Sequence, residues 1–422
     1  MSPGAEKARL AARIESRAAA LVDLCRSLVR IDSTNPPGDT TAIIEAIEAV
    51  LDATLGIEYR RVVGRAPAVN LVARVRGAGS GRRLVLNGHL DTFPVGEARW
   101  SHPPLGADLE DGRIYGRGAC DMKAGVAAQV LAFVTLAELC DAWRGELVLT
   151  LVGDEETGGR WGTQYLLANV EEAVGDAMLN ADTGSPRVVR IGEKGNVWVE
   201  LEATGVASHA AHVHLGRNAV DALIDALGVV RALEDLAFSL PEAVERTIAQ
   251  AQAVSEAESG KGEAETLQRI TVNTGRIEGG IGVNTIPDRA RALCDIRIPP
   301  GVTVDQVRAE LVSAIDPLPD VSWRVLECTE PSWTEPEEEI VRAVRENAAA
   351  VTGGEVVVNL RAGFSDARFW RHAGVPSVVY GVAPHRMGGA DEYATVEDLK
   401  AVFAVHAFAA FDYLRGRQGK AG

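Results

Sequence analysis

A histidine and a carboxylate stand two residues apart in the stretch NGHLDT at residues 87–92. The apolar residues 84–86 just before it predict a buried strand. His89 and Asp91 then lie where that strand ends, on one face if it continues. An imidazole with a carboxylate close behind it suits a metal site, because the carboxylate fixes the tautomer that binds the ion. A lone histidine at a strand end is more often an ordinary polar contact, so this pair needs support from elsewhere in the chain.

Four acidic residues stand at the ends of later predicted elements: Asp121 before a long run rich in Ala and Leu, Glu155 and Glu156 after a β-rich run, and Asp182 after a short apolar run. Each has a plain structural alternative, as a helix cap, a solvated turn or an Asx-turn. Together they would lie at the carboxyl edge of one parallel sheet, where ligands bind, and would repel one another without a cation between them. One imidazole among several carboxylates favours Zn²⁺, Mn²⁺ or Co²⁺.

The two adjacent glutamates can divide the work of a metal-dependent hydrolase. One side chain binds the ion, and the other stays free to take a proton from the water molecule that the ion activates, since this chemistry needs a base beside the metal. The spacing alone leaves open which of the two plays which role.

Two kinds of structure must position these residues. In the first and last parts of the chain, predicted strands alternate with helices, which indicates an α/β domain with a mixed, mainly parallel sheet and helices on both faces. Residues 196–329 follow the order β-α-β-β-α-β of a ferredoxin-like α+β domain. Within them, a polar insertion at 237–268 is expected to form a helix and a mobile, solvated loop. We therefore predict one α/β domain formed by residues 1–195 and 330–422, interrupted by the domain at 196–329.

Three local expectations concern single elements. One amphipathic helix is expected over residues 5–30. A long helix is expected to open at Asp121 and to run to about residue 139, because this stretch is rich in Ala and Leu. A capping box formed by Thr303 and Gln306 predicts the start of another helix.

The composition limits the class of protein. The chain has 422 residues, 46% of them hydrophobic, and a formal net charge of −16. This predicts two domains and argues against a nucleic-acid or anionic-membrane partner. Five cysteines are scattered without close pairs, so neither disulfides nor a zinc finger is expected, and a cytoplasmic location is predicted. The charged start of the chain lacks the apolar core of a signal peptide, and no apolar run approaches the length of a membrane span.

Longer stretches resemble the metallopeptidase and deacylase family that includes carboxypeptidase G, acetylornithine deacetylase, succinyl-diaminopimelate desuccinylase and the aminoacylases. The matching stretches are NGHLDT at 87–92, YGRGACDMKAG at 115–125, DEETG at 154–158, SHA at 208–210, GRNA at 216–219, GG at 279–280, NTIPD at 284–288, DIR at 295–297, SDAR at 365–368 and DEY at 391–393. They span nearly the whole chain and are specific in combination. The resemblance implies a catalytic α/β domain with an inserted lid and dimerisation domain.

The resemblance also implies a metal centre of one or two ions. His89 and Asp182 would bind one ion, and Glu156 would bind a second. Asp121 would bridge the two, and Asp91 would fix the orientation of His89.

The remaining roles implied by the resemblance concern catalysis and substrate binding. Glu155 would be the general base. His209 would reach the active site of a neighbouring subunit and stabilise the oxyanion, while Asn284 and Arg297 would hold the carboxylate of the substrate. The expected partners are therefore a small carboxylate-bearing substrate and further copies of the chain, in a homo-oligomer built from dimers.

The chain departs from the family pattern at one metal ligand. The family places a histidine of the second ion four residues before the glutamate that matches Glu392, and this chain has Gly388 there. The nearest imidazole is that of His385. Two outcomes stay open: the glycine-rich loop directs His385 to the metal, since glycines permit unusual backbone paths, or the second site is weak or empty.

Three hypotheses for the function remain open at this point. The leading one is a metal-dependent hydrolase that cleaves a C–N bond of an N-acyl amino acid or another small amide with a carboxylate. The second is an aminohydrolase, which uses the same metal and base to release ammonia from an electron-poor aryl amine such as 5-nitroanthranilate. The third is a metal- or peptide-binding protein without catalytic activity, although the intact Glu155, Asp121 and Glu156 weigh against it.

Overall fold

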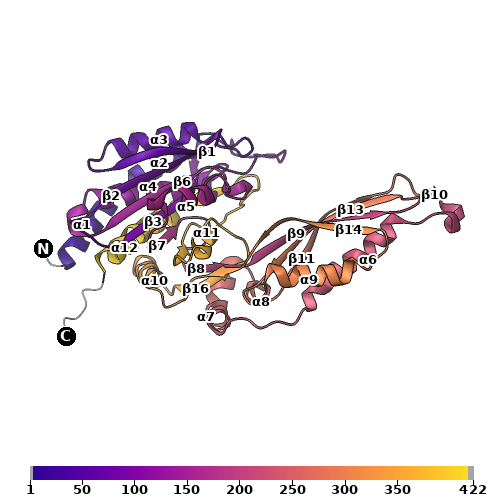
Figure 1. Cartoon of the computed structure of the whole chain (residues 1–422). Coiled ribbons are helices and arrows are strands. Elements are labelled where there is room, and N and C mark those ends of the chain that lie inside the picture. The colour runs from indigo at the N-terminus through magenta and orange to yellow at the C-terminus, as the bar shows by residue number, and fades with distance from the viewer. Residues whose placement is uncertain (1–2, 417–422) are drawn as a thin grey trace.

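The computed structural model describes residues 3–416, which form two unequal parts (Figure 1). A broad α/β body contains both ends of the described chain. A long, narrow arm extends from the body and ends at the short strand β10, Ser208–His209. The body is formed by the first and last parts of the chain and the arm by its middle, so the predicted fold class is confirmed.

The body is built on a nine-stranded mixed sheet in the order β1-β2-β6-β3-β7-β17-β8-β15, with β16 beside β8. Its centre, β6-β3-β7-β17, is parallel, and antiparallel pairs flank this centre on both sides. The strands are β1 Glu58–Arg65, β2 Ala68–Arg76, β3 Arg83–His89, β6 Glu146–Val152, β7 Ala177–Asn180, β8 Val188–Glu193, β15 Ser332–Trp333, β16 Val357–Arg361 and β17 Ser377–Val379. A small separate sheet joins β4 Asp108–Glu110, β5 Arg113–Tyr115 and β18 Tyr393–Thr395.

Helices cover both faces of the central sheet. In β3, Leu84 and Leu86 join one hydrophobic cluster, whereas Val85 joins another that contains Trp370. Neighbouring side chains of a strand point to opposite faces, so each face has its own core. The body helices are α1 Pro3–Ser16, α2 Ala18–Val29, α3 Thr41–Asp52, α4 Ala124–Ala137, α5 Thr163–Asn169, α10 Glu339–Thr352, α11 Ala367–His372 and α12 Val396–Arg415.

Helix α4 is the central helix of the body, and every one of its residues is buried. Together with the turn before it, it forms the stretch Ala119–Ala137, which is long and apolar enough to cross a membrane by length and composition. A helix was expected here, but the expectation that no apolar run approaches the length of a membrane span is wrong for this stretch. Because 94% of its apolar window is buried within the protein, it is a core helix, packed against α12 and β3.

The arm is a four-stranded antiparallel sheet in the order β11-β13-β9-β14. Helices α6 and α9 share one hydrophobic core with it, in the predicted ferredoxin-like order. The predicted capping box of Thr303 and Gln306 opens α9. The arm elements are β9 Gly195–Thr204, α6 Ala219–Ala232, β11 Thr271–Gly279, β13 Arg289–Ile298, α9 Val304–Ile315 and β14 Val321–Thr329, with β10 and β12 Thr285–Ile286 at the tip.

The insertion between α6 and β11 differs from the expectation. It forms α7 Glu242–Ser259 and α8 Glu263–Gln268, which leave the arm and pack on the body beside β16. Apolar side chains such as Val244 and Ile248 belong to the main core of the body. The expected helix is therefore confirmed, but the insertion is not a solvated surface segment, because its helices carry a buried apolar face.

Two helix boundaries are also corrected. The helix expected over residues 5–30 is divided at Arg17 into α1 and α2. The helix expected to open at Asp121 begins at Ala124 instead. Asp121 lies in the preceding turn, with φ −120° and ψ 95°, so it is not a helix cap and its carboxylate remains available for other contacts.

Candidate active site

Three neighbouring parallel strands bring predicted site residues to one edge of the sheet. Strands β6, β3 and β7 lie side by side, and His89 is the last residue of β3. Glu155 and Glu156 follow β6 in a short 3₁₀ turn, and Asp182 follows the end of β7 by two residues. The carboxyl ends of adjacent parallel strands therefore gather these four side chains.

Asp121 reaches this edge from a different element, the turn Ala119–Lys123 before α4. The backbone amides of Cys120 and Asp121 donate hydrogen bonds to Oε1 of Glu392, at 3.1 and 3.3 Å. The other carboxylate oxygen of Glu392 pairs with Nη1 of Arg117 at 2.5 Å. This buried ion pair holds the turn, and so Glu392 of the DEY motif acts on the position of Asp121 through the backbone.

His89, Asp121 and Glu156 could hold a metal ion together. One ligand atom from each lies within 4.8 Å of the other two, and residues 3–416 contain no second group of three that meets this test. Nε2 of His89 is 3.0 Å from Oδ1 of Asp121. Oε1 of Glu156 is buried without a hydrogen-bond partner in the described chain, which is costly unless a cation compensates. One imidazole nitrogen and two carboxylates match Zn²⁺, Mn²⁺ or Co²⁺, so these residues fit a divalent transition-metal ion.

Asp91 organises both the imidazole and the glutamate pair. Nδ1 of His89 lies 3.0 Å from the backbone oxygen of Asp91 and 3.5 Å from its Oδ1, which leaves Nε2 free for a metal. The Asp91 carboxylate accepts hydrogen bonds from the backbone amides of Glu155 and Glu156, at 3.2 and 3.1 Å, and from Nδ2 of Asn35 at 2.9 Å. A single carboxylate thus sets the relative positions of His89 and the two glutamates.

Burial raises the pKa values of the clustered carboxyl groups. Burial and the neighbouring charge of Asp121 raise the pKa of Glu156 to about 10. Burial also raises the pKa of Glu155 well above its usual value and raises that of Asp182. A divalent cation among these groups would lower each pKa, because it stabilises the charged carboxylates. The electrostatics therefore agree with a cation-binding centre.

Two arginines at this site were missed in the sequence analysis. Nη1 of Arg361 lies 3.4 Å from Oδ2 of Asp182 and donates to the backbone oxygen of Thr183 at 3.1 Å. Nη1 of Arg368 lies 3.5 Å from Oε1 of Glu155. Arg368 belongs to the SDAR stretch that matches the family, so the sequence could have pointed to it. Arg361 lies in no matching stretch. Asp182, paired with Arg361, is outside the three-residue ligand group.

Comparison with known proteins agrees with this geometry. Residues 85–411 match the family model for peptidase family M20/M25/M40, which is more than half of the chain. The chain belongs to this M20 family. Membership of the M20 family and the donor set described above identify the chain as a metal-dependent hydrolase of C–N bonds. The hypothesis of a non-catalytic binding protein is set aside.

Individual relatives show how far the likeness extends. The succinyl-diaminopimelate desuccinylase of Paracoccus denitrificans is 30% identical over 396 residues, which cover 91% of this chain and 95% of that protein. An M20 metallo-carboxypeptidase of Sulfolobus solfataricus has the same fold, with a TM-score of 0.76 and 21% identity over 92% of this chain and 98% of its own. A Bacillus subtilis protein described as a dinuclear metal-binding M20 peptidase is similar with a TM-score of 0.66 and 13% identity, over 95% and 99% of the two chains.

The loop that replaces the second metal histidine of the M20 pattern has a defined structure. The ring of His385 stacks on that of Tyr393, with centroids 4.5 Å apart and an interplanar angle of 7°. His385 is not in the three-residue ligand group. The backbone oxygen of Gly388 accepts a hydrogen bond from Nη2 of Arg117 at 2.9 Å, which holds this loop beside the Asp121 turn. In this structure the imidazole of His385 therefore lies against Tyr393, outside the three-residue ligand group.

We expect this M20 enzyme to retain nearer one divalent ion per chain than two after gentle dialysis. A position without the second nitrogen ligand is oxygen-rich and open, and it should bind transition metals more weakly. Elemental analysis against protein concentration measures this ratio. Glu156→Gln should lower the retained metal, and His385→Ala should leave it unchanged. A stable pair of ions with His385 coordinated would contradict the expectation.

Arg297 lies where the arm meets the body. It stands near the end of β13, and its Nε pairs with Oδ1 of Asp295 at 2.8 Å. Its guanidinium lies over the ring of Phe364, a body residue, at 4.8 Å from the centroid. Nη1 of Arg297 is buried without a hydrogen-bond partner in the described chain. Arg297 therefore brings a positive charge and an unpaired donor to the junction of the arm and the body.

His209 and Asn284 lie together at the tip of the arm. Strand β10 pairs with β12, and the backbone oxygen of Asn284 accepts a hydrogen bond from the amide of Ala210 at 2.9 Å. Both side chains are exposed. The tip lies at the far end of the molecule from β3, β6 and β7 (Figure 1). Within one chain these two residues are therefore not brought to the metal centre.

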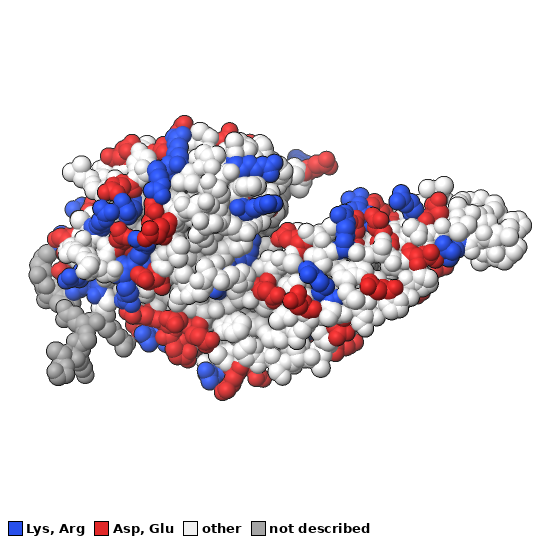
Figure 2. Space-filling view, viewed as in Figure 1, with Lys and Arg blue, Asp and Glu red and all other residues white. Residues whose placement is uncertain are grey.

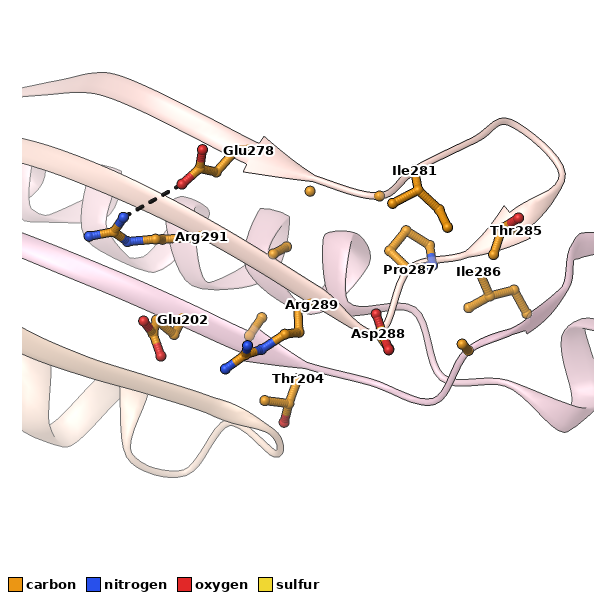
Figure 3. A pocket seen from close by; sticks show the side chains of 15 residues that line it. Glu202, Thr204, Glu278, Ile281, Thr285, Ile286, Pro287, Asp288, Arg289 and Arg291 are labelled. Carbon is orange, nitrogen blue, oxygen red and sulfur yellow. Dashed lines mark ion pairs between the residues drawn. The ribbon is translucent and has the colours of Figure 1, made fainter.

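A pocket of about 440 Å³ lies on the arm sheet near the tip (Figure 3). Its charged lining includes Glu278 and Arg291, which pair with each other at 3.5 Å. Arg291 also pairs with the buried Glu200. None of the predicted site residues lines this pocket, so it is separate from the centre at the sheet edge.

Proposed function

We propose that this M20 enzyme removes the acyl group from an N-acyl amino acid, or from a similar small amide that carries a carboxylate. The observation that carries the proposal is the half-buried pair of adjacent glutamates: Glu156 belongs to the ligand group, and Glu155 lies beside it but outside that group. The desuccinylase named above, whose substrate is an acyl amide with carboxylates, supports this substrate class.

The proposed mechanism assigns the proton transfers to Glu155. A divalent ion held by His89, Asp121 and Glu156 would supply Lewis acidity for the scissile carbonyl and for a water molecule. Glu155 accepts a proton from that water at its carboxylate and then passes it to the leaving amine. Arg368 keeps the carboxylate of Glu155 in place by its charge.

Residues of the arm would complete the site. Arg297 of the same chain would bind the substrate carboxylate by its charge, and Asn284 of a second copy of the chain would add a hydrogen bond. His209 of a second copy of the chain would donate a hydrogen bond to the developing oxyanion. The arm at 196–329 would thus act as lid and dimerisation domain, and the residues before and after it as the catalytic domain.

The surface of the arm tip supports a homo-oligomer built from dimers. Large apolar side chains are strongly exposed there, with Leu215 at 63%, Ile281 at 95% and Val283 at 102% of their full accessibility. The tip lacks charged side chains on the face seen in Figure 2. Exposed apolar clusters of this kind mark interaction surfaces, and a second copy would cover this one while receiving His209.

We further propose Mn²⁺, Zn²⁺ or Co²⁺ as the ion and the cytoplasm as the location. The nitrogen and oxygen donor set suits all three metals. Each of the five cysteines is free of disulfides within residues 3–416, which suits a reducing compartment.

A product screen tests the proposed function. Protein loaded with Mn²⁺, Zn²⁺ or Co²⁺ is incubated with N-succinyl and N-acetyl amino acids, and free amine and carboxylic acid are measured separately. We expect equal amounts of both products from at least one substrate with a free carboxylate, and much less from its methyl ester. Glu155→Gln protein is the control for contaminating hydrolases. Absence of metal-stimulated amine release across the panel would contradict the deacylase proposal.

The aminohydrolase remains the second candidate, because the loop around Gly388 departs from the family pattern at a metal ligand. In this reaction the electron-poor ring carbon takes the hydroxide and ammonia leaves. The same screen with aminobenzoates, including 5-nitroanthranilate, separates the two candidates: the aminohydrolase releases ammonia without releasing a carboxylic acid.

A further inference from the structure

The ring of Phe364 joins the arm to the general base through two arginines. It lies 4.8 Å from the guanidinium of Arg297, in the arm, and 4.5 Å from that of Arg368, in the body. Phe364 is half-buried, on the loop between β16 and α11. Because a cation held over an aromatic face is attracted to the ring, both arginines depend on where this side chain lies.

Arg368 is held firmly enough that a movement of Phe364 would reach Glu155 through it. Its side chain is 2% exposed, and its guanidinium also lies 4.2 Å from the ring of Phe369. Nη1 donates to the backbone oxygen of Ser365 at 2.7 Å and lies 3.5 Å from Oε1 of Glu155. A small displacement of Arg368 would therefore change the distance of its charge from Glu155.

Arg297 is more open to solvent than Arg368. Its side chain is 22% exposed, and its Nη1 lacks a hydrogen-bond partner in the described chain. Two like charges near one ring repel each other. A carboxylate bound to Arg297 would neutralise one of them, so Arg368 would settle more closely against Phe364.

We propose that Phe364 is a positioning residue that links capture of the substrate carboxylate by Arg297 to alignment of Glu155 by Arg368. The proposal rests on the proposed function, in which Glu155 is the base and Arg297 the anchor. It predicts that the substrate carboxylate raises kcat as well as binding affinity. The reason is that binding energy gained at Arg297, away from the reacting bond, is used to orient Glu155.

The kinetic test compares Phe364→Leu with Phe364→Tyr. Loss of the ring should lower kcat on a carboxylate-bearing substrate by roughly 3- to 30-fold, the range of a partly buried cation–π contact, and tyrosine should restore kcat to within about twofold, because it keeps the aromatic face. On the methyl ester of the substrate, Phe364→Leu should lower kcat by much less than on the carboxylate-bearing substrate, because only the contact of the ring with Arg368 is then lost. Equal losses on both substrates, or no rescue by tyrosine, would overturn the proposal.

Phe369→Leu is the matched control, since Phe369 contacts Arg368 and has no such contact with Arg297. It should lower kcat on both substrates. In an Arg297→Met background, Phe364→Leu should have no further carboxylate-dependent effect, whereas Phe369→Leu should still lower kcat. Additive losses for Arg297→Met and Phe364→Leu would show that the two residues act independently.

A second test measures the response of Arg368 to carboxylate binding and does not depend on catalytic turnover. The Nε–H signal of Arg368, assigned by its absence in Arg368→Lys, is followed by ¹⁵N NMR while succinate is added as the probe carboxylate. The signal should shift in the wild type and in Glu155→Gln, and stay unchanged in Phe364→Leu and in Arg297→Met. If the Arg368 signal shifts in Glu155→Gln and that variant is fully active, Glu155 is not the general base, but the link from Arg297 through Phe364 to Arg368 still holds. A shift in Phe364→Leu as large as in the wild type would overturn the link itself.

Discussion

Glu155→Gln protein should keep its metal and lose roughly 10²- to 10⁴-fold in kcat, the usual contribution of a general base. Glutamine has nearly the same shape, so the turn held by Asp91 remains in place. It cannot accept a proton, and it leaves the ligand group of His89, Asp121 and Glu156 unchanged. The measurement is kcat on a substrate found in the product screen, together with metal content by elemental analysis.

Glu156→Gln is the matched comparison for this variant, because the two glutamates are adjacent and both are shielded from solvent. It should lose metal as well as activity, and added Mn²⁺ or Zn²⁺ should restore part of the activity. If Glu155→Gln turned over at a near-normal rate while loaded with metal, Glu155 would be removed from the mechanism. If it lost metal to the same extent as Glu156→Gln, its role would be that of a ligand.

His209→Ala should lower kcat by roughly 10²- to 10³-fold, as expected for loss of a hydrogen-bond donor to an oxyanion. His209 is exposed at the arm tip, so the variant should fold normally. His214→Ala is the control on the same exposed segment, and it should retain most of the activity. A similar loss in both variants would indicate a general effect on the arm tip.

Mixing two inactive variants tests whether His209 acts on the other subunit. In a hybrid dimer of Glu155→Gln and His209→Ala chains, one site would contain an intact Glu155 and receive an intact His209. Random exchange should then restore about a quarter of wild-type activity, since half of the dimers are hybrids with one working site each. Failure to recover activity, with subunit exchange proven by differently tagged chains, would contradict the arrangement across subunits.

Much of the architecture could be predicted from local patterns in the chain. Apolar runs such as residues 84–86 become buried strands because both faces of the central sheet are covered. The order of elements in the arm and the capping box at Thr303 depend on neighbouring residues alone. For the same reason His89 and the two glutamates could be placed at strand ends: a strand and the turn that follows it are encoded within a few residues.

Contacts between distant parts of the chain could not be predicted in this way. Arg117 and Glu392, 275 residues apart, form the buried pair that holds the Asp121 turn. Helices α7 and α8 read as polar in sequence, but their apolar face packs on the body. Each of these depends on which surfaces meet after folding, and the residue pattern of one segment carries no information about its partner.

The site shows the same difference between features set by local sequence and features set by contacts between distant segments. The sequence by itself determined the residue types of a metal-dependent hydrolase and their order at strand ends. Only the tertiary structure decided that His385 stacks on Tyr393, that Asp182 faces Arg361, and that Phe364 lies against both Arg297 and Arg368. The physical reason is that strand ends are set by local hydrogen bonding and burial, whereas the direction of a long side chain is set by the charges and rings that other segments bring beside it.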